Sequence, residues 1–143
     1  MMARVFSLHL GRGPGLPKTR VESLELVAEH GALGDRHAGK DAARAVLVTG
    51  LPAYQSARES GIELAYGALG ENLILDIDPH QLGPGQRLRV AGALLGLSTS
   101  CTVCETLAVF DPRLPRLLYN KRGMYARVIK GGVVHIGDAV ALE

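Results

Sequence analysis

The sequence predicts a mainly β, barrel-like fold with two or three short helices, and three observations carry this prediction. Glycine accounts for 18 of the 143 residues, and the glycines fall between short apolar segments. The turn signals recur too closely for a succession of strand–helix–strand units. Many short strands separated by turns are typical of a barrel, with a mixed α+β sandwich as the alternative. The chain contains no repeat or low-complexity linker, so residues 1–143 are expected to form a single domain.

The first half of the chain predicts three strands and one helix. Residues 5–10 and 21–28 alternate apolar and polar side chains imperfectly, as half-buried strands do, and the Gly/Pro-rich loop 11–18 separates them. Residues 45–49 (AVLVT) are typical of a buried strand. The segment 52–59 predicts a helix, because a proline stands in its first turn and a glycine lies just past its end.

The second half of the chain predicts two hairpins. The turn Ala91-Gly92 separates the apolar segments 87–90 and 93–97, and Lys130-Gly131-Gly132 separates the segments 125–129 and 133–136. The other elements expected in this half are a strand at 73–77, a short helix at 112–119 and a last strand at 139–142.

Composition and charge exclude several classes of function. The formal net charge is only +2 and aromatic residues make up 4%, so neither a nucleic-acid surface nor a base-stacking platform is expected. No apolar run approaches the roughly 18 residues that span a bilayer, and the N-terminal residues do not read as a signal peptide. Two cysteines are too few for a disulfide scaffold, so we expect a cytoplasmic protein.

A compact charged loop is the first candidate site. Asp35, Arg36 and His37 are consecutive and stand between glycines that let the backbone turn sharply. A guanidinium fork suits phosphate or another oxyanion, and Lys18 and Lys40 add positive charge nearby. The alternative is an ordinary turn, in which the carboxylate caps backbone amides and the arginine makes a surface ion pair.

A thiol pair, Cys101 and Cys104, is the second candidate site. A structural zinc site needs four ligands, so the pair would have to recruit His37 and His135. A thioredoxin-like redox motif would open a helix between two strands, and that context is absent. In the third interpretation one thiolate, Cys104, is a metal ligand or a nucleophile, and burial of an inert cysteine is the alternative to it.

Two further segments offer polar side chains. Glu71 and Asn72 lead into the strand at 73–77, where they either cap a turn or, for Asn72, hydrogen-bond to a heterocycle. Residues 121–127 carry three cations around a glycine, and they form either a solvated loop or an anion clamp that closes the site.

Taken in order, these segments resemble the MOSC domain family, which is related to the C-terminal part of molybdenum cofactor sulfurases. The matching stretches are Pro17-Lys18, VESLELVAEHGALGDRHAGK from Val21, GENL from Gly70, QLGPGQRLRVAGALLGLS, the cysteine segment ending at Cys104, and RGMYARVIKGGVVHIGDAV from Arg122. The resemblance therefore covers nearly the whole chain. One departure is that Val103 precedes the late cysteine, where the family often has proline.

The resemblance implies a β-barrel of the PK β-barrel-like type that binds the molybdenum cofactor, a pterin carrying a phosphate and a dithiolene-bound metal. It implies Cys104 as the molybdenum ligand, Asp35 and His37 as catalytic residues, and a set of cofactor-binding residues: Lys18, Arg36, Asn72 and Arg127. Cys101 would be a neighbouring thiol. Family descriptions also name pyridoxal phosphate, but no lysine here lies in a context that favours a Schiff base.

Three hypotheses about function follow from these residues and the resemblance. The first is an oxidoreductase that reduces a small N-hydroxylated substrate with electrons from a separate donor protein. The second is a carrier that receives sulfur from a donor protein as a persulfide on Cys104. The third is a non-catalytic module that binds a phosphate-bearing molecule. None of the three involves nucleic acid or a membrane.

Overall fold

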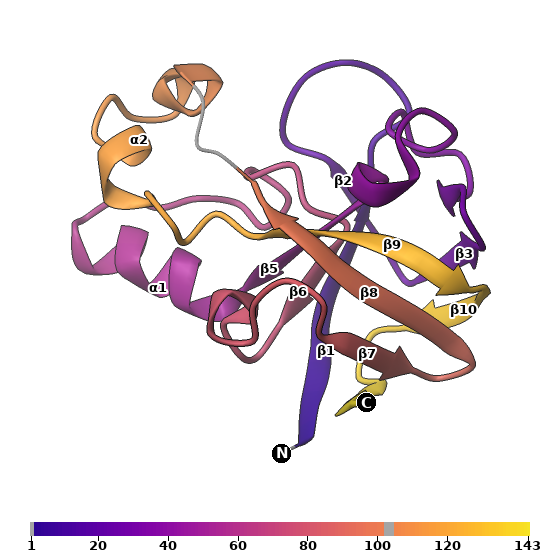
Figure 1. The fold of residues 1–143 in the computed structure, drawn as a ribbon. Coiled ribbons are helices and arrows are strands. Elements are labelled where there is room, and N and C mark those ends of the chain that lie inside the picture. Colours follow the sequence, from indigo (N-terminus) through magenta and orange to yellow (C-terminus); the bar gives the residue numbers. More distant parts are fainter. Residues whose placement is uncertain (1, 102–104) are drawn as a thin grey trace.

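The computed structural model describes residues 2–101 and 105–143 (Figure 1). Within these residues the chain is mainly β, as predicted, with short helical segments between the strands. The strands are β1 Met2–Leu10, β2 Thr19–Val21, β3 Ser23–Val27, β4 Gly31–Ala32, β5 Val46–Gly50, β6 Leu73–Leu75, β7 Arg87–Val90, β8 Ala93–Ser100, β9 Met124–Lys130, β10 Gly132–His135 and β11 Ala139–Leu142. The helical segments are η1 Ala42–Arg44, α1 Leu51–Glu59, η2 Pro79–Gln81, η3 Glu105–Val109 and α2 Leu114–Leu117.

The larger sheet closes on itself into a barrel. Its strands follow the order β11-β7-β8-β9-β5-β6-β1, and β11 pairs with β1, so the two ends of the order meet. Met2 lies opposite Ala141 across this closure. The pairing of β5 with β6 is parallel, whereas the other pairings around the barrel are antiparallel. The chain reaches from β5 to β6 through α1, which lies beside the barrel (Figure 1).

The strand predicted over residues 21–28 is confirmed at its centre as β3, but the first residue of the segment, Val21, belongs to β2 in a different sheet. β2 extends the large sheet by pairing with β1, and β3 pairs with β10 and β4 in a three-stranded sheet. Glu22 lies between the two strands. The imperfect alternation of this segment therefore reflects a change of partner.

One predicted hairpin is confirmed and the other is wrong. β7 and β8 pair around the turn at Ala91, which has φ +53°. β9 instead pairs with β8 and β5, whereas β10 pairs with β3. The physical reason is that Lys130 belongs to β9 and Gly132 to β10, so one residue separates the strands, and the favoured hairpin loops need two.

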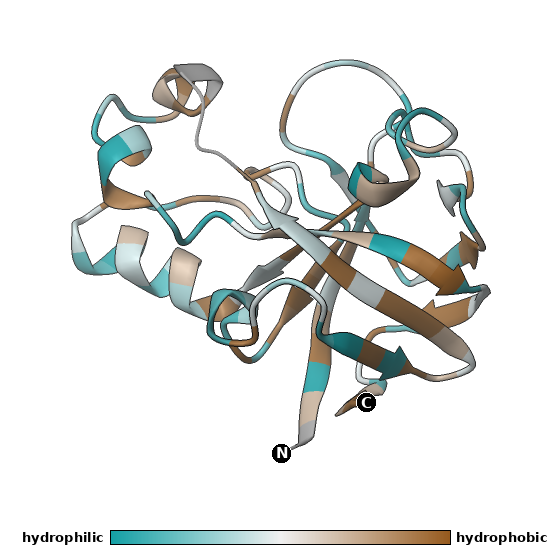
Figure 2. Ribbon diagram, viewed as in Figure 1, coloured by the Kyte–Doolittle hydropathy of each residue, from teal (hydrophilic) through white to brown (hydrophobic). Residues whose placement is uncertain are grey.

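Apolar residues are frequent along the barrel strands (Figure 2), and the buried ones form two hydrophobic clusters. β6 illustrates the two faces: Leu73 and Leu75 point into the barrel core, whereas Ile74 packs outside it against α1 and α2. Alternate strand residues face opposite sides of a sheet, so this one strand supports both cores. Among the described residues, no helix is long and apolar enough to cross a membrane.

Candidate functional site

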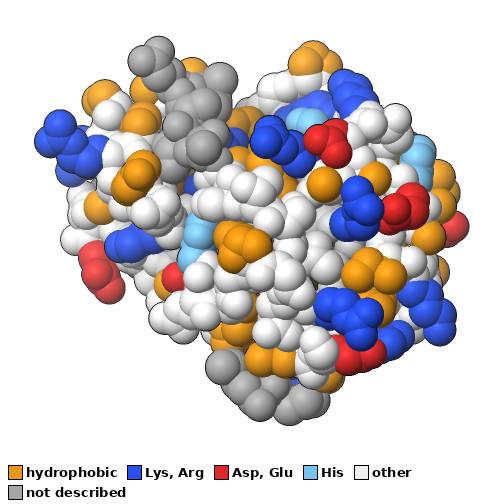
Figure 3. Space-filling model, viewed as in Figure 1, with side chains coloured by type: hydrophobic (Ala, Val, Ile, Leu, Met, Phe, Trp, Pro, Cys, Tyr) orange, Lys and Arg blue, Asp and Glu red, His pale blue; other side chains and the backbone are white. Residues whose placement is uncertain are grey.

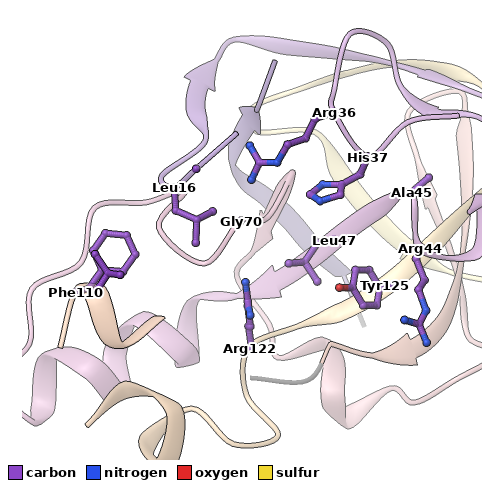
Figure 4. A pocket seen from close by; sticks show the side chains of 12 residues that line it. Leu16, Arg36, His37, Arg44, Ala45, Leu47, Gly70, Phe110, Arg122 and Tyr125 are labelled. Carbon is purple, nitrogen blue, oxygen red and sulfur yellow. The ribbon is translucent and has the colours of Figure 1, made fainter. Parts of the chain in front are cut away.

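A pocket of about 460 Å³ lies where the loop after β1, the charged loop and the start of β9 meet. In the close-up, Arg36 and His37 lie on one side and Arg122 on the opposite side, with Arg44 and Tyr125 beside it (Figure 4). Apolar groups line the rest of the wall. The residues that line the pocket are Gly15, Leu16, Arg36, His37, Arg44, Ala45, Leu47, Gly70, Val109, Phe110, Arg122 and Tyr125.

Asp35 organises the charged loop from below the pocket surface. Its side chain is fully buried, and its Oδ1 accepts hydrogen bonds from the Gly11 amide (2.9 Å) and from Asn72 Nδ2 (3.1 Å). Its Oδ2 accepts from the His37 amide (3.1 Å) and from Lys18 Nζ (3.2 Å). Burial by itself would raise the pKa of Asp35, but the hydrogen bonds from the Gly11 and His37 amides and the Lys18 charge outweigh it and hold the pKa well below its usual range.

Lys18 lies beneath His37 and determines which nitrogen of the ring faces the pocket. The Lys18 side chain is fully buried, and its Nζ lies 3.2 Å from His37 Nδ1. Burial lowers the pKa of Lys18, although the neighbouring Asp35 carboxylate opposes this change. A charged ammonium can only donate, so Nδ1 accepts the proton of this hydrogen bond. Nε2 of the half-exposed His37 ring then carries the hydrogen and is a donor.

Asn72 joins the charged loop to the barrel and does not reach the pocket. It is fully buried; its Nδ2 donates to the His9 carbonyl and to Asp35, and its Oδ1 accepts from the Leu47 amide. The amide therefore fixes three chain segments relative to one another. A cofactor-binding role for Asn72 stays a prediction, and the structure adds this bridging position to it.

Three guanidinium groups reach the pocket from separate parts of the chain. Arg36 donates to the Gly13 carbonyl at 2.7 Å, and Arg122 donates through Nε and Nη2 to the Leu69 carbonyl. Arg44 stands over the Tyr125 ring at 5.7 Å from its centroid. Gly11 makes room for the first of these, because a Cβ there would meet Arg36 Nη1 at 2.6 Å.

On the face seen in Figure 3, Lys and Arg side chains are spread widely and are interspersed with acidic ones. The pocket wall itself carries three of the cations, Arg36, Arg44 and Arg122.

Tyr125 contributes a hydroxyl donor to the same wall. Cys101 Sγ donates to Tyr125 Oη at 3.3 Å, so the hydroxyl hydrogen is left for a ligand. Burial and the contact with Cys101 raise the pKa of Tyr125 to about 12, although the charges of Arg122 and Arg44 oppose the rise. The hydroxyl is thus protonated at neutral pH. The ionisable and hydroxyl side chains lining this pocket therefore present hydrogen-bond donors, which suits an oxyanion.

Glu71 lies fully buried beside the site. Its Oε2 accepts a hydrogen bond from Tyr54 Oη, and its Oε1 has no hydrogen-bond partner among the described residues. Burial raises the pKa of Glu71, whereas the Tyr54 hydroxyl works against the rise. Burial, and then the Glu71 charge, raise the pKa of Tyr54. An ionised carboxylate with an unpartnered buried oxygen is unfavourable, so this pair favours a neutral Glu71.

The predicted site residues fall into distinct positions. Arg36 and His37 line the pocket, whereas Lys18, Asp35 and Asn72 form the layer beneath it. The described residues that line the pocket or lie beneath it do not include the remaining two predicted residues, Arg127 and Cys104.

Arg127 lies on β9 outside the set of pocket-lining residues, and its Nη1 pairs with Glu29 Oε1 at 3.4 Å. Cys104 lies outside the described residues. The described part of the chain holds no cluster of three or more His, Cys, Asp or Glu side chains suited to a metal ion.

Sequence reasoning missed Arg44 and did not single out Arg122. The signal for Arg122 was its place in the cationic segment 121–127, next to Gly123. Nothing in the sequence around Arg44 indicates a site, because it is a single cation before a buried strand. It lines the pocket because it lies at the end of η1.

Residues 34–141 match the sequence model of the MOSC domain. No curated protein matches the chain. Among solved structures, the YuaD protein from Bacillus subtilis is similar over 99% of this chain and 96% of its own, with a TM-score of 0.85 and 18% identity.

Two YiiM proteins are similar as well. YiiM from Geobacillus stearothermophilus has a TM-score of 0.79 and 22% identity, covering 99% of this chain and 75% of that one. YiiM from Escherichia coli has a TM-score of 0.77 and 25% identity, and the similarity covers 100% of this chain and 70% of that one.

Proposed function

Because the chain belongs to the MOSC domain family, we propose that it binds the molybdenum cofactor and acts as a small oxidoreductase component that reduces N-hydroxylated compounds. The observation that carries this proposal is the pocket wall. It combines three guanidinium groups, Arg36, Arg44 and Arg122, with donors from His37 and Tyr125.

The residues present fit the cofactor by their chemistry. A phosphate presents several oxygen acceptors and negative charge, which guanidinium groups bind with charge-assisted hydrogen bonds. Leu16 and Phe110 supply apolar wall for a flat ring system. A volume of about 460 Å³ lies within the range of small-molecule and cofactor sites.

We assign the thiolate ligand to Cys104. The described residues on either side of its segment border the pocket: Cys101 hydrogen-bonds Tyr125, and Val109 lines the wall. A thiolate is a soft ligand of the kind that molybdenum–sulfur chemistry uses. When bound, the cofactor supplies the two-electron chemistry, and the electrons come from a separate donor protein.

His37 is proposed as the proton donor. Reduction of a hydroxylamine to an amine and water takes up two electrons and two protons, and one proton goes to the departing hydroxyl. The Nε2 hydrogen of His37 faces the pocket, and Lys18 lies 3.2 Å from Nδ1 on the other side of the ring. As Nε2 releases its proton to the departing hydroxyl, Lys18 transfers a proton to Nδ1, so the ring stays neutral throughout. Solvent then restores the proton on Lys18 and the Nε2 tautomer, and it supplies the second proton, which is taken up at the substrate nitrogen. Asp35 positions both groups and stays ionised.

The deciding experiment is elemental analysis for molybdenum, together with pterin fluorescence after oxidative release. The protein is purified anaerobically from a host that makes the cofactor, and a known molybdoenzyme from that host serves as the loading control. Near-stoichiometric molybdenum and pterin support the proposal. If the control is loaded and this protein carries neither, the persulfide carrier or the phosphate-binding module takes its place.

Two cysteine variants test the ligand. Cys104→Ser is expected to lose molybdenum, whereas Cys101→Ser, the matched control, keeps it. Full molybdenum content in Cys104→Ser would refute the ligand assignment. A reducible adduct of one sulfur on Cys104, without metal, would support the carrier function.

A further inference from the structure

The loop that carries Arg122 is fixed through its backbone by three hydrogen bonds. Thr49 Oγ1 donates to the Arg122 carbonyl (2.6 Å), and the Cys101 amide donates to the Gly123 carbonyl (2.8 Å). The third bond comes from the Gly123 amide, which donates to Nε2 of His80 at 2.9 Å. Thr49 belongs to β5, Cys101 directly follows the end of β8, and the third partner is a titratable side chain on η2.

The conformation of this loop depends on a glycine. Gly123 has φ +150°, and a Cβ on it would lie 2.6 Å from the Val48 carbonyl oxygen. The backbone therefore packs directly against β5. From this fixed point the Arg122 side chain reaches Leu69, where two of its nitrogens share one carbonyl, and its guanidinium lines the pocket.

His80 can hold Gly123 only as a neutral ring. Nε2 accepts the amide hydrogen, and a protonated imidazolium has no acceptor to offer. Asp78, on the same turn, accepts from the His80 amide, and its charge favours protonation. Burial has the larger effect and lowers the pKa of His80 below its ordinary value. The neutral ring is thus the form present at neutral pH.

Among the described residues around His80, Asp78 supplies the charge that acts on the ring. β5, which packs against η2, contributes the uncharged Thr49 to the shared loop. Arg122 turns its guanidinium away to Leu69, and Lys121 donates to Ser56 on α1. Cys101 touches the loop through its backbone amide, and its thiol points to Tyr125.

We propose that His80 is a positioning residue for the anion pocket: its neutral ring holds Gly123 and so keeps Arg122 at the pocket wall, and protonation of the ring releases this anchor. The inference concerns the pocket itself, so it holds for any anion bound there and does not depend on molybdenum. Protonation of His80 at acidic pH would weaken anion binding, although His80 itself never touches the anion.

The test uses ¹⁵N-labelled full-length protein and inorganic sulfate, which stays a dianion over the range from about pH 8 to about pH 5. The Gly123 amide and the Arg122 side-chain Nε–H resonance are followed with pH, and sulfate affinity is measured at each pH. Three variants are compared: His80→Gln, which offers an acceptor that does not titrate; His80→Leu, which offers none; and His135→Gln, a largely exposed control.

We expect the Gly123 and Arg122 resonances of the unmodified protein to titrate together. Its sulfate affinity should fall with decreasing pH by about fivefold more than that of His80→Gln, as loss of one hydrogen bond implies. His80→Leu should bind weakly at every pH, and His135→Gln should follow the unmodified protein.

Identical pH dependence in the unmodified protein and His80→Gln would overturn the inference. So would a Gly123 amide that does not change over the pH range, a measurement that needs neither a variant nor bound sulfate. Neither outcome bears on molybdenum content, so failure here is distinct from failure of the proposed function.

Discussion

Replacing Asp35 with asparagine tests whether the buried Lys18–Asp35 pair holds the charged loop in place. Asparagine has the same shape, but its amide group would face two donors. Whichever way the side chain turns, two of the four donors around Asp35 lose their acceptor, and Lys18 is left buried without a counter-charge. Breaking a buried pair in this way costs about 3–5 kcal/mol of unfolding free energy.

The assay is chemical denaturation at neutral pH, with Asp111→Asn as the control. Asp111 pairs with Arg113 at the surface, where loss of an ion pair costs about 1 kcal/mol or less. The double variant Lys18→Met/Asp35→Asn removes the stranded charge, so we expect it to be more stable than additivity predicts, by about 2 kcal/mol. The reasoning is refuted if Asp35→Asn costs no more than the control, or if the two changes are additive.

The same pair gives a pH dependence with a defined sign. The folded-state pKa of Asp35 is depressed, so its contribution is fully present above the ordinary pKa of 3.8 and is lost as pH falls below it. Stability of the unmodified protein should therefore fall in this acidic range. Asp35→Asn should show a shallower fall there, because the site has nothing left to protonate.

Three further predictions concern the surroundings of the site. Gly123→Ala should destabilise the protein by about 2 kcal/mol or more in denaturation, since its Cβ would overlap the Val48 carbonyl; unchanged stability would contradict the packing described. The unmodified protein should lose stability as pH rises through the elevated pKa of Glu71, because the buried carboxyl must then ionise. Glu71→Gln should not show this loss, and urea titrations at acidic and alkaline pH would reveal the difference. Arg122→Met should weaken sulfate binding about tenfold or more by calorimetry, whereas Arg127→Met, away from the pocket, should leave it unchanged; equal effects would refute the assignment.

The elements that the sequence predicted correctly are those whose formation depends on neighbouring residues. The helix at α1 begins where a proline fixes the first turn, and the β7–β8 hairpin forms where Ala91-Gly92 can reverse the chain. The charged loop was also identifiable, because three ionisable residues stand between glycines. These features depend on residues within a few positions of one another.

The failures of prediction concern pairings between distant segments. No property of Glu22 marks the change of sheet between β2 and β3, which depends on where β1 and β10 lie. In the segment 121–127, Arg122 and Arg127 have the same chemistry, and only the strand register decides which one meets the pocket. The two arginines differ in their position in three dimensions, which the residue type alone does not reveal.

The late arrival of β9 has a consequence for the order of events during synthesis. β9 lies between β5 and β8, and it brings Arg122 and Tyr125 to a pocket whose other walls are in place by residue 110. While the ribosome is still making the last strands, β5 has an open edge and the barrel has a gap. The binding site therefore forms only once the chain has been made through β9. The pairing that closes the barrel joins residues 2 and 141, so we expect closure of the barrel to be the slowest, least local step of folding.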